Sequence, residues 1–259
     1  DGQIYNINMR NGYYELYYPD SIQSNQITKI EDITPVRTWW DTLTTQGIDD
    51  GNGHGTHVAG IAAAITDNSI GIAGTCPQCQ LIIAKALGND ATGNSSNVAS
   101  GINWAADQGA KVINMSLGID ASDPAVETAV SNAWNRGVVI VAAAGNTRPG
   151  HTDPTVKTYP ASYQNVVAVA ATDNNDHLAT FSFRGTWVDV AAPGVNIYST
   201  LPTHTHTLQS AGKRLNYDYL GGTSMAAPMV SGVVGLIWAS SYGTSNTSVA
   251  QRLLNSADK

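Results

Sequence analysis

The sequence predicts an α/β protein, a single domain over residues 1–259 with a mostly parallel central sheet and helices on both faces. Two observations lead to this prediction. Between residues 54 and 146, helical patterns and short apolar runs alternate along the chain, as they do in successive β-α-β units. The 259 residues, 42% of them hydrophobic, can bury one large core, and no low-complexity linker or internal repeat divides them.

The first elements of this pattern follow each other closely. Residues 54–65 are rich in alanine and other small residues, which is typical of a buried helix. The apolar run 79–84 predicts a strand that is covered on both faces. Residues 96–108 place apolar side chains at helical spacing, and Gly109 provides a natural stop for this helix.

The pattern continues to the end of the chain. The sequence predicts strands over residues 111–116, 138–143, 166–170 and 188–191, and helices over residues 123–136 and 224–240. The stretch 203–219 is polar and is expected to be a surface excursion in which His204 and His206 are solvated.

Composition excludes several classes of partner. The chain has 20 acidic and 13 basic side chains and a formal net charge of −7, with no basic run, so neither a nucleic-acid nor an anionic-membrane partner is expected. The longest apolar stretch, residues 137–144, is far shorter than the ~20 residues that a bilayer span requires. Because no signal peptide opens the sequence, we expect either a cytosolic product or a mature, processed form.

The segment Asn-Gly-His-Gly-Thr-His-Val-Ala-Gly, residues 52–60, places His54 at the start of the first helix. A histidine held by the packing of a small-residue helix suits a general base, which needs a fixed position and a pKa near the working pH. The same residues also allow a metal pair of His54 with His57, or a buried capping histidine. The motif has no glutamate, which argues against a zinc protease.

Two further segments are candidates for chemistry. Ser224 follows glycines at the start of an apolar helix, where helix N–H groups favour incoming negative charge, although an ordinary N-cap serine is an alternative. Asn146 comes directly after a buried strand, at the sheet edge where ligands bind, and its amide can donate to a developing oxyanion. A turn-forming Gly-Asn pair is the alternative there.

Together, the three motifs closely resemble those of the subtilisin-like serine proteases, the subtilase family. His-Gly-Thr-His at residues 54–57, Ala-Gly-Asn at 144–146 and Gly-Thr-Ser-Met-Ala at 222–226 occur in the chain order of that family. The resemblance runs from about Asp49 to Lys259 and implies a single-domain subtilisin-like fold and a serine endopeptidase. It implies that Ser224 attacks the peptide carbonyl, that His54 transfers the proton, and that Asn146 and the Ser224 N–H hold the oxyanion.

The resemblance also implies where a polypeptide substrate binds. The edge formed by Ser116, Leu117 and Gly118 pairs with the substrate backbone, and Gly93 and Ser95 lie on the opposite rim. The pocket for the side chain before the scissile bond (P1) is expected between the first edge and the residues Ala143, Ala144 and Gly145. Its floor is expected near Thr158, before a Tyr159–Pro160 bond that is cis in relatives. No charged residue is evident there, so apolar or aromatic P1 residues are expected.

The catalytic aspartate departs from the family pattern. The chain lacks the Asp-(Ser/Thr)-Gly signature, and residues 1–45 match the family poorly. Asp20 follows a strand-like run, residues 14–18, and lies 34 residues before His54, so it is the favoured candidate. Asp1 is a second candidate, whereas the counterpart of Asp50 in relatives supports the start of the helix. If no aspartate is in place, the alternative function is a subtilase-fold protein that binds peptides with little or no activity; an esterase is a third possibility.

Calcium is the cofactor that the resemblance implies. The loop at residues 66–72 resembles one that wraps a structural Ca²⁺ in many subtilases, with ligands from the Asn68 side chain and the carbonyls of Thr66, Ile70 and Ile72. Gln3 is the implied side-chain ligand from the N-terminal part, and a plain glycine-containing loop is the alternative. The resemblance further implies a secreted monomer that matures from a precursor with a propeptide.

The chain contains two cysteines, Cys76 and Cys79, in a loop before a predicted strand. Two cysteines cannot build a disulfide framework, and zinc would need two more ligands than the neighbouring residues provide. A short-loop disulfide is expected if the protein is secreted, and the sequence leaves the redox state of the pair open.

Overall fold

The computed structural model describes residues 35–40 and 49–258. Its helices and strands, in chain order, are β1 (Pro35–Trp40), α1 (His54–Ala63), β2 (Leu81–Lys85), α2 (Ser95–Asp107), β3 (Val112–Met115), α3 (Pro124–Asn135), β4 (Val139–Ala143), β5 (Val166–Thr172), β6 (Val190–Pro193), β7 (Ile197–Thr200), the 3₁₀ helix η1 (Thr207–Ala211), β8 (Tyr217–Leu220), α4 (Thr223–Trp238) and α5 (Asn246–Ser256).

Parallel strands form the centre of the molecule. The strands β3, β4, β5 and β6 make a four-stranded sheet in that order, with Val112 opposite Val139 and Ile140 opposite Val166. β1 and β2 form a separate parallel pair, and β7 and β8 an antiparallel one. Within the described residues, no strand joins β2 to β3, so each of these strands has one edge without a described partner.

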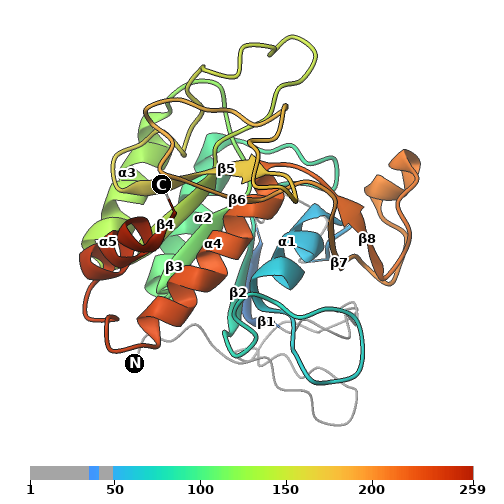
Figure 1. Cartoon of the computed structure of the whole chain (residues 1–259), viewed down its shortest axis with the longest axis horizontal. Coiled ribbons are helices and arrows are strands. Elements are labelled where there is room, and N and C mark those ends of the chain that lie inside the picture. Colours follow the sequence, from blue (N-terminus) through green and yellow to red (C-terminus); the bar gives the residue numbers. More distant parts are fainter. Residues whose placement is uncertain (1–34, 41–48, 259) are drawn as a thin grey trace.

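Helices cover both faces of the four-stranded sheet (Figure 1). All five residues of β4 are buried, and their side chains alternate between the hydrophobic cores on the two faces of the sheet. Ile140 and Ala142 pack with α2 and α3, whereas Val139, Val141 and Ala143 pack with α4 and α5. The predicted α/β class, with a parallel sheet between two helical layers, is confirmed.

The predicted helices and strands between residues 54 and 240 occur, with their ends shifted by at most two residues. The polar stretch 203–219, expected to be a surface excursion, contains η1 and most of β8, which the sequence analysis did not predict. His206 is buried and its Nε2 lies 3.1 Å from the carbonyl oxygen of Arg214, while His204 Nε2 lies 3.0 Å from an Asp49 carboxylate oxygen. The expectation that both histidines are solvated was therefore wrong for His206, whereas the His204 side chain is 32% exposed.

The two cysteines form a disulfide, the bond that was expected if the protein is secreted. Both are buried in a small cluster with Ala59 and Ala63 of α1, beside the start of β2.

The Tyr159–Pro160 bond is cis, as the family resemblance implied. In the described part of the chain, no helix combines the length and apolar character needed to cross a bilayer.

Candidate active site

His54 is the first residue of α1, and the chain before it is fixed by Asp50. One Asp50 carboxylate oxygen accepts hydrogen bonds from the N–H groups of Asn52 and Gly53, and the other accepts from the N–H and hydroxyl of Thr56 at 2.7 and 2.6 Å. These bonds satisfy N–H groups that the first helical turn leaves open. Asp50 therefore caps the helix that presents His54, which agrees with the supporting position expected for it.

The His54 ring is half-buried at the start of this helix. Burial lowers the pKa of His54 below its usual value of 6.5, and the Asp50 carboxylate partly offsets this effect. A lowered pKa keeps the imidazole neutral at neutral pH, which is the form that accepts a proton.

Ser224 is the second residue of α4, and the glycine pair at residues 221–222 comes directly before this helix. Gly222 has φ 153°, a conformation that favours glycine, and its missing side chain leaves space beside Asn146. The Ser224 hydroxyl donates to the carbonyl oxygen of Ser116 at 3.4 Å, and the Ser116 hydroxyl donates to the Ser224 carbonyl at 2.8 Å. In this structure the Ser224 hydroxyl is therefore turned toward the end of β3 rather than hydrogen-bonded to His54.

Asn146 is oriented by Thr223, a residue that the sequence analysis did not single out. The Asn146 Oδ1 accepts the Thr223 N–H at 2.9 Å, and the Thr223 hydroxyl accepts the Gly145 N–H at 3.0 Å. Because its oxygen is used in this way, the amide of Asn146 has its N–H groups available as donors. The Thr-Ser pair of the motif was the signal that could have identified Thr223.

A cavity of about 420 Å³ lies between β2 and β3 and connects several of these residues. The cavity wall near the start of β2 includes Cys79. The wall near the residues that follow β2 and β3 includes His54, Ser116 and Leu117. The structure therefore places His54 and Ser116 on one cavity, and Ser116 contacts Ser224 directly.

Three of the residues expected to bind substrate follow one another at the end of β4. Ala143 is the last residue of β4, and Ala144 and Gly145 follow it. Thr158 is buried and its hydroxyl donates to the Ala144 carbonyl at 2.6 Å, so it lies against this segment.

The two edges lie as follows. Gly118 is exposed beside the backbone of Tyr159, next to the hydrogen-bonded pair Ile119–Tyr159. On the other rim, Gly93 packs against Leu87, which lines the cavity. Ser95 begins α2, and its hydroxyl hydrogen-bonds the Asp123 carboxylate, which lowers the pKa of Asp123.

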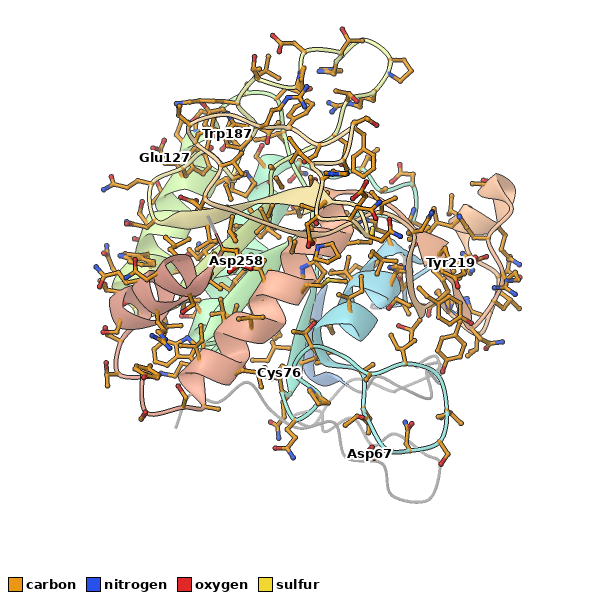
Figure 2. The ribbon with its side chains drawn as sticks, in the orientation of Figure 1. Asp67, Cys76, Glu127, Trp187, Tyr219 and Asp258 are labelled. Carbon is orange, nitrogen blue, oxygen red and sulfur yellow. A yellow bond between two sulfur atoms is a disulfide. The ribbon has the colours of Figure 1, made fainter. Side chains whose placement is uncertain are left out.

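The loop expected to bind calcium curls around an open hollow that is lined by residues 66–73. Asp67, Ser69 and Gly71 have left-handed backbone conformations in alternation, which bends the loop sharply. Figure 2 shows Asp67 at the edge of the molecule, away from the sheet. The described residues contain no group of three or more His, Cys, Asp or Glu side chains that could hold a metal ion. Asp20 and Gln3 lie outside the described residues.

His57, the second histidine of the motif, does not face an active site. It is fully buried under the β7–β8 ribbon, and its Nε2 lies 3.1 Å from the Asp218 carbonyl oxygen. The Ser199 hydroxyl donates to its backbone carbonyl. The structure therefore gives His57 a packing position and supports no metal pair with His54.

The burial of His57 predicts a pH dependence of stability. Burial lowers the pKa of His57 to about 4, although the Asp218 carbonyl opposes this effect. Between pH 6.5 and 4 the unfolded chain binds a proton that the folded chain rejects, so stability is fully present above pH 6.5 and falls as the pH falls through this window. The expected loss is roughly 3 kcal/mol.

Urea unfolding measured between pH 4 and 7 checks this expectation. The His57→Gln variant keeps an amide donor at the same place but does not titrate, so its free energy of unfolding is expected to depend less on pH over this range. An identical slope in both proteins would contradict the assignment.

Comparison with known families and proteins agrees with this arrangement. Residues 17–259 match the family model described as Peptidase_S8, Subtilase family. The chain is 49% identical over 221 residues to thermitase from Thermoactinomyces vulgaris, a match that covers 85% of this chain and 73% of thermitase. It is 43% identical over 208 residues to subtilisin Savinase from Lederbergia lenta, which covers 80% of this chain and 71% of that protein.

Two further relatives are longer than this chain. The thermophilic serine proteinase of Bacillus sp. (strain AK1) is 48% identical over 210 residues, and the match covers 81% of this chain but only 48% of that protein. Among solved structures, a protease from Pseudoalteromonas arctica PAMC 21717 has a TM-score of 0.71 at 32% identity, covering 80% of this chain and 66% of that one.

Proposed function

Because the chain belongs to the subtilase family of serine endopeptidases, we propose that it hydrolyses peptide bonds through an acyl-enzyme formed on Ser224. The observation that supports this most is the arrangement at the start of α4. Ser224 lies at a helix N-terminus, beside an asparagine whose amide is oriented by Thr223. His54 lies on the cavity whose wall includes Ser116, the contact residue of Ser224.

The proposed chemistry follows from these positions. On substrate binding, the Ser224 hydroxyl rotates from the Ser116 carbonyl toward His54, which takes its proton as the oxygen attacks the peptide carbonyl. The Asn146 amide and the Ser224 N–H donate to the oxyanion that forms, assisted by the positive end of the α4 dipole. His54 then returns the proton to the leaving amine, and water completes the hydrolysis by the same path.

We propose that Asp20 supplies the carboxylate that orients His54. Among the described residues, β2 and β3 each have one edge without a strand partner. Residues of both strands line one cavity, and a strand can bind there by adding its backbone to both edges. The Asn52 side chain, just before α1, donates to the carbonyl oxygen of Asn89, just after β2. The C-terminal end of β2 is therefore the end of the cavity that lies near His54. The strand-like run at residues 14–18 matches β2 in length, and in parallel orientation it would bring Asp20 to that end.

The pocket region supports a preference for apolar or aromatic P1 residues. Ala143, Ala144 and Thr158 carry no charge and are buried, so nothing there would pair with a basic P1 side chain. A panel of chromogenic peptides that differ only at P1 is expected to show the highest kcat/KM after Phe or Leu. Fastest cleavage after Arg or Lys would contradict this preference.

We propose that the loop at residues 66–72 holds a structural Ca²⁺. Its curled backbone and the Asn68 side chain offer the hard oxygen donors that Ca²⁺ takes, with the carbonyls of Thr66, Ile70 and Ile72 and the Gln3 side chain as the remaining ligands. The ion would hold the loop that joins α1 to the disulfide segment. It would supply stability rather than chemistry at Ser224.

Removal of calcium is expected to lower the melting temperature. At a free concentration of about 100 times Kd, the ion stabilises the fold by about 2.7 kcal/mol, which corresponds to roughly 5–10 °C for a chain of this size. Thermal unfolding with and without a chelator measures the shift. An Asn68→Ala variant is expected to lose most of it, and a wild-type melting temperature that chelator leaves unchanged would contradict the site.

We further propose that the protein acts as a secreted monomer, matured from a precursor with a propeptide, on protein and peptide substrates. The Cys76–Cys79 disulfide supports secretion, because such bonds persist in oxidising compartments.

An active-site serine reagent tests the proposed function. Rapid stoichiometric labelling of Ser224 by a fluorophosphonate, together with casein digestion, is the expected result. Labelling without proteolysis would indicate an esterase. Absence of labelling would indicate a subtilase-fold peptide-binding protein, the alternative that follows if no aspartate orients His54.

A further inference from the structure

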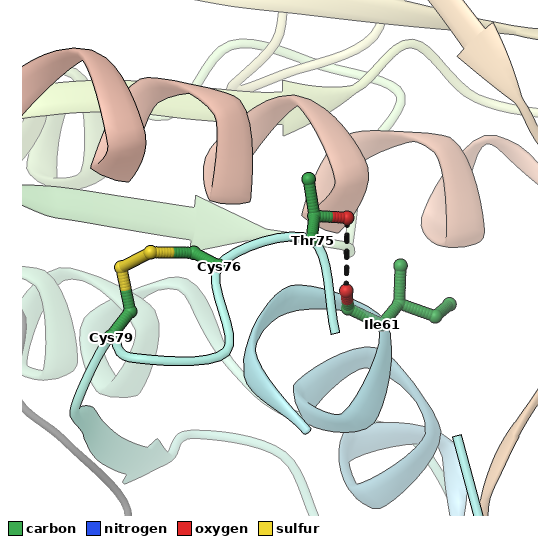
Figure 3. The surroundings of a disulfide bond; sticks show 4 residues. All are labelled: Ile61, Thr75, Cys76 and Cys79. Carbon is green, nitrogen blue, oxygen red and sulfur yellow. Dashed lines mark hydrogen bonds between the residues drawn. A yellow bond between two sulfur atoms is a disulfide. The ribbon is translucent and has the colours of Figure 1, made fainter. Parts of the chain in front are cut away.

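Residues 74–76, here called the strap, lie where the helix that begins with His54 crosses the helix that presents Ser224 (Figure 3). α1 and α4 pack against each other, and the strap runs past the C-terminal half of α1 below α4. A Cβ at Gly232 of α4 would lie 2.5 Å from the Thr75 Cβ and 3.1 Å from the Ala62 carbonyl oxygen. The missing side chain at Gly232 therefore lets the two helices and the strap meet.

The strap is hydrogen-bonded to the end of α1 at every residue. The N–H groups of Gly74, Thr75 and Cys76 donate to the carbonyls of Ala64, Ile61 and Ala62 at 2.9, 2.9 and 2.8 Å. The Thr75 hydroxyl also donates to the Ile61 carbonyl at 3.2 Å. These carbonyls belong to the last turn of the helix, which has no partners of its own for them, so the strap completes the end of α1.

The contact between the two helices is equally far from His54 along α1 and from Ser224 along α4. Ala62 is eight residues beyond His54, and Gly232 is eight residues beyond Ser224. At the helical rise of 1.5 Å per residue, the contact is about 12 Å from each reacting side chain. From this contact, α1 leads to His54 and α4 leads to Ser224, so each helix connects the crossing to one reacting side chain.

The disulfide fixes the strap to the sheet. Cys76 ends the strap, and Cys79 lies two residues before β2. The side chains of Cys76 and Cys79 are 3% and 7% exposed. A bond that closes so short a loop restrains the unfolded chain only weakly, because the entropy it removes grows with loop length. Its main effect is therefore local, on the strap and on the end of α1.

We propose that the Cys76–Cys79 disulfide is a positioning device, which locks the strap at the crossing of α1 and α4 and so sets the geometry between His54 and Ser224. The catalytic consequence rests on the proposed function. The cysteines act through the helices and touch no substrate. A dithiol reductant opens the bond by two thiol–disulfide exchanges, which leave two cysteine thiols and the oxidised, cyclic form of the reagent.

The test compares wild-type protein with a variant that carries Cys76→Ala and Cys79→Ala, well below the unfolding temperature of both. For a short chromogenic peptide, kcat is expected to fall at least tenfold with KM within twofold, because geometry at the reacting atoms changes while the substrate edges remain. The rate of fluorophosphonate labelling at Ser224 is expected to fall in parallel. The double variant is expected to be insensitive to dithiothreitol, and reduced wild-type protein is expected to recover on reoxidation.

Two variants of α4 provide a second approach with the disulfide intact. Gly232→Ala places a methyl group against Thr75 and is expected to lower kcat in the same way as loss of the disulfide. Val233→Ala is its matched control, because Val233 is the next residue of the helix, is 38% exposed, and is expected to leave kcat unchanged.

Hydrogen exchange separates failure of this inference from failure of the proposed function. The amides of residues 74–76 are expected to exchange at least tenfold faster in the double variant. Unchanged exchange would overturn the proposal whatever the activity, and faster exchange with kcat within twofold of wild type would reduce the disulfide to a structural bond. Wild-type protein that neither labels nor cleaves would contradict the proposed function and the catalytic part of this inference, while exchange would still decide whether the disulfide holds the strap.

Discussion

Replacing Ser224 with alanine is expected to lower kcat by about 10⁶-fold, the size of effect established for loss of the nucleophile in subtilisins. The reason is that no neighbouring group can take over the attack. The Ser116 hydroxyl contacts Ser224, but it donates to the Ser224 backbone carbonyl and has no described base beside it. The oxyanion donors at Asn146 remain in place, so a residual rate above that in water is expected.

Initial-rate measurements on casein and on a short chromogenic peptide check this expectation, together with fluorophosphonate labelling. Ser256→Ala is a suitable control, since Ser256 is an exposed serine at the end of α5 whose hydroxyl bonds only the Arg252 carbonyl. Folding of the Ser224→Ala variant is expected to be close to wild type because the hydroxyl makes one long hydrogen bond of 3.4 Å. Retained hydrolysis in a correctly folded variant would remove Ser224 from the mechanism.

Replacing Asp20 with asparagine is expected to lower kcat by about 10⁴-fold, because the imidazole would lose the carboxylate that fixes its tautomer and stabilises its charged form. Asp50 is the closest competing candidate in the described part of the chain. Its two oxygens already accept four hydrogen bonds from the start of α1, so it has little capacity left to orient the ring.

A comparison of Asp20→Asn with Asp50→Asn separates the two candidates. Asp50→Asn is expected to cost about 1 kcal/mol of stability through the weakened cap, with a smaller loss of kcat than Asp20→Asn. Thermal unfolding and kcat are measured on both variants. Full activity in Asp20→Asn would show that Asp20 does not stand behind His54. An inactive wild type would instead favour the peptide-binding alternative.

The sequence alone identified the elements that present the candidate site. Local signals sufficed for these, because a helix start, a glycine pair or a buried strand is encoded within a few neighbouring residues. His54 at the start of α1 and Ser224 in the first turn of α4 are examples. The motif order also indicated the family that residues 17–259 match.

The tertiary structure decided what holds these groups in place. Thr223 orients Asn146 across 77 residues, and the Ser116 carbonyl meets Ser224 across 108. His206 was expected to be solvated, yet it is buried against the segment that leads into α1. Such contacts depend on which faces pack together, and no periodicity within a segment specifies a partner so far away in the chain.

The choice of Asp20 illustrates the difference between local sequence signals and long-range contacts in the folded domain. Spacing along the sequence selects Asp20 as the candidate, whereas only the folded domain shows that residues of β2 and β3 line one cavity together with His54. Composition and periodicity determine which residues can form helices, strands and turns. Backbone pairing and side-chain packing over long separations determine how the reacting groups meet, because those contacts exist only once the chain has folded.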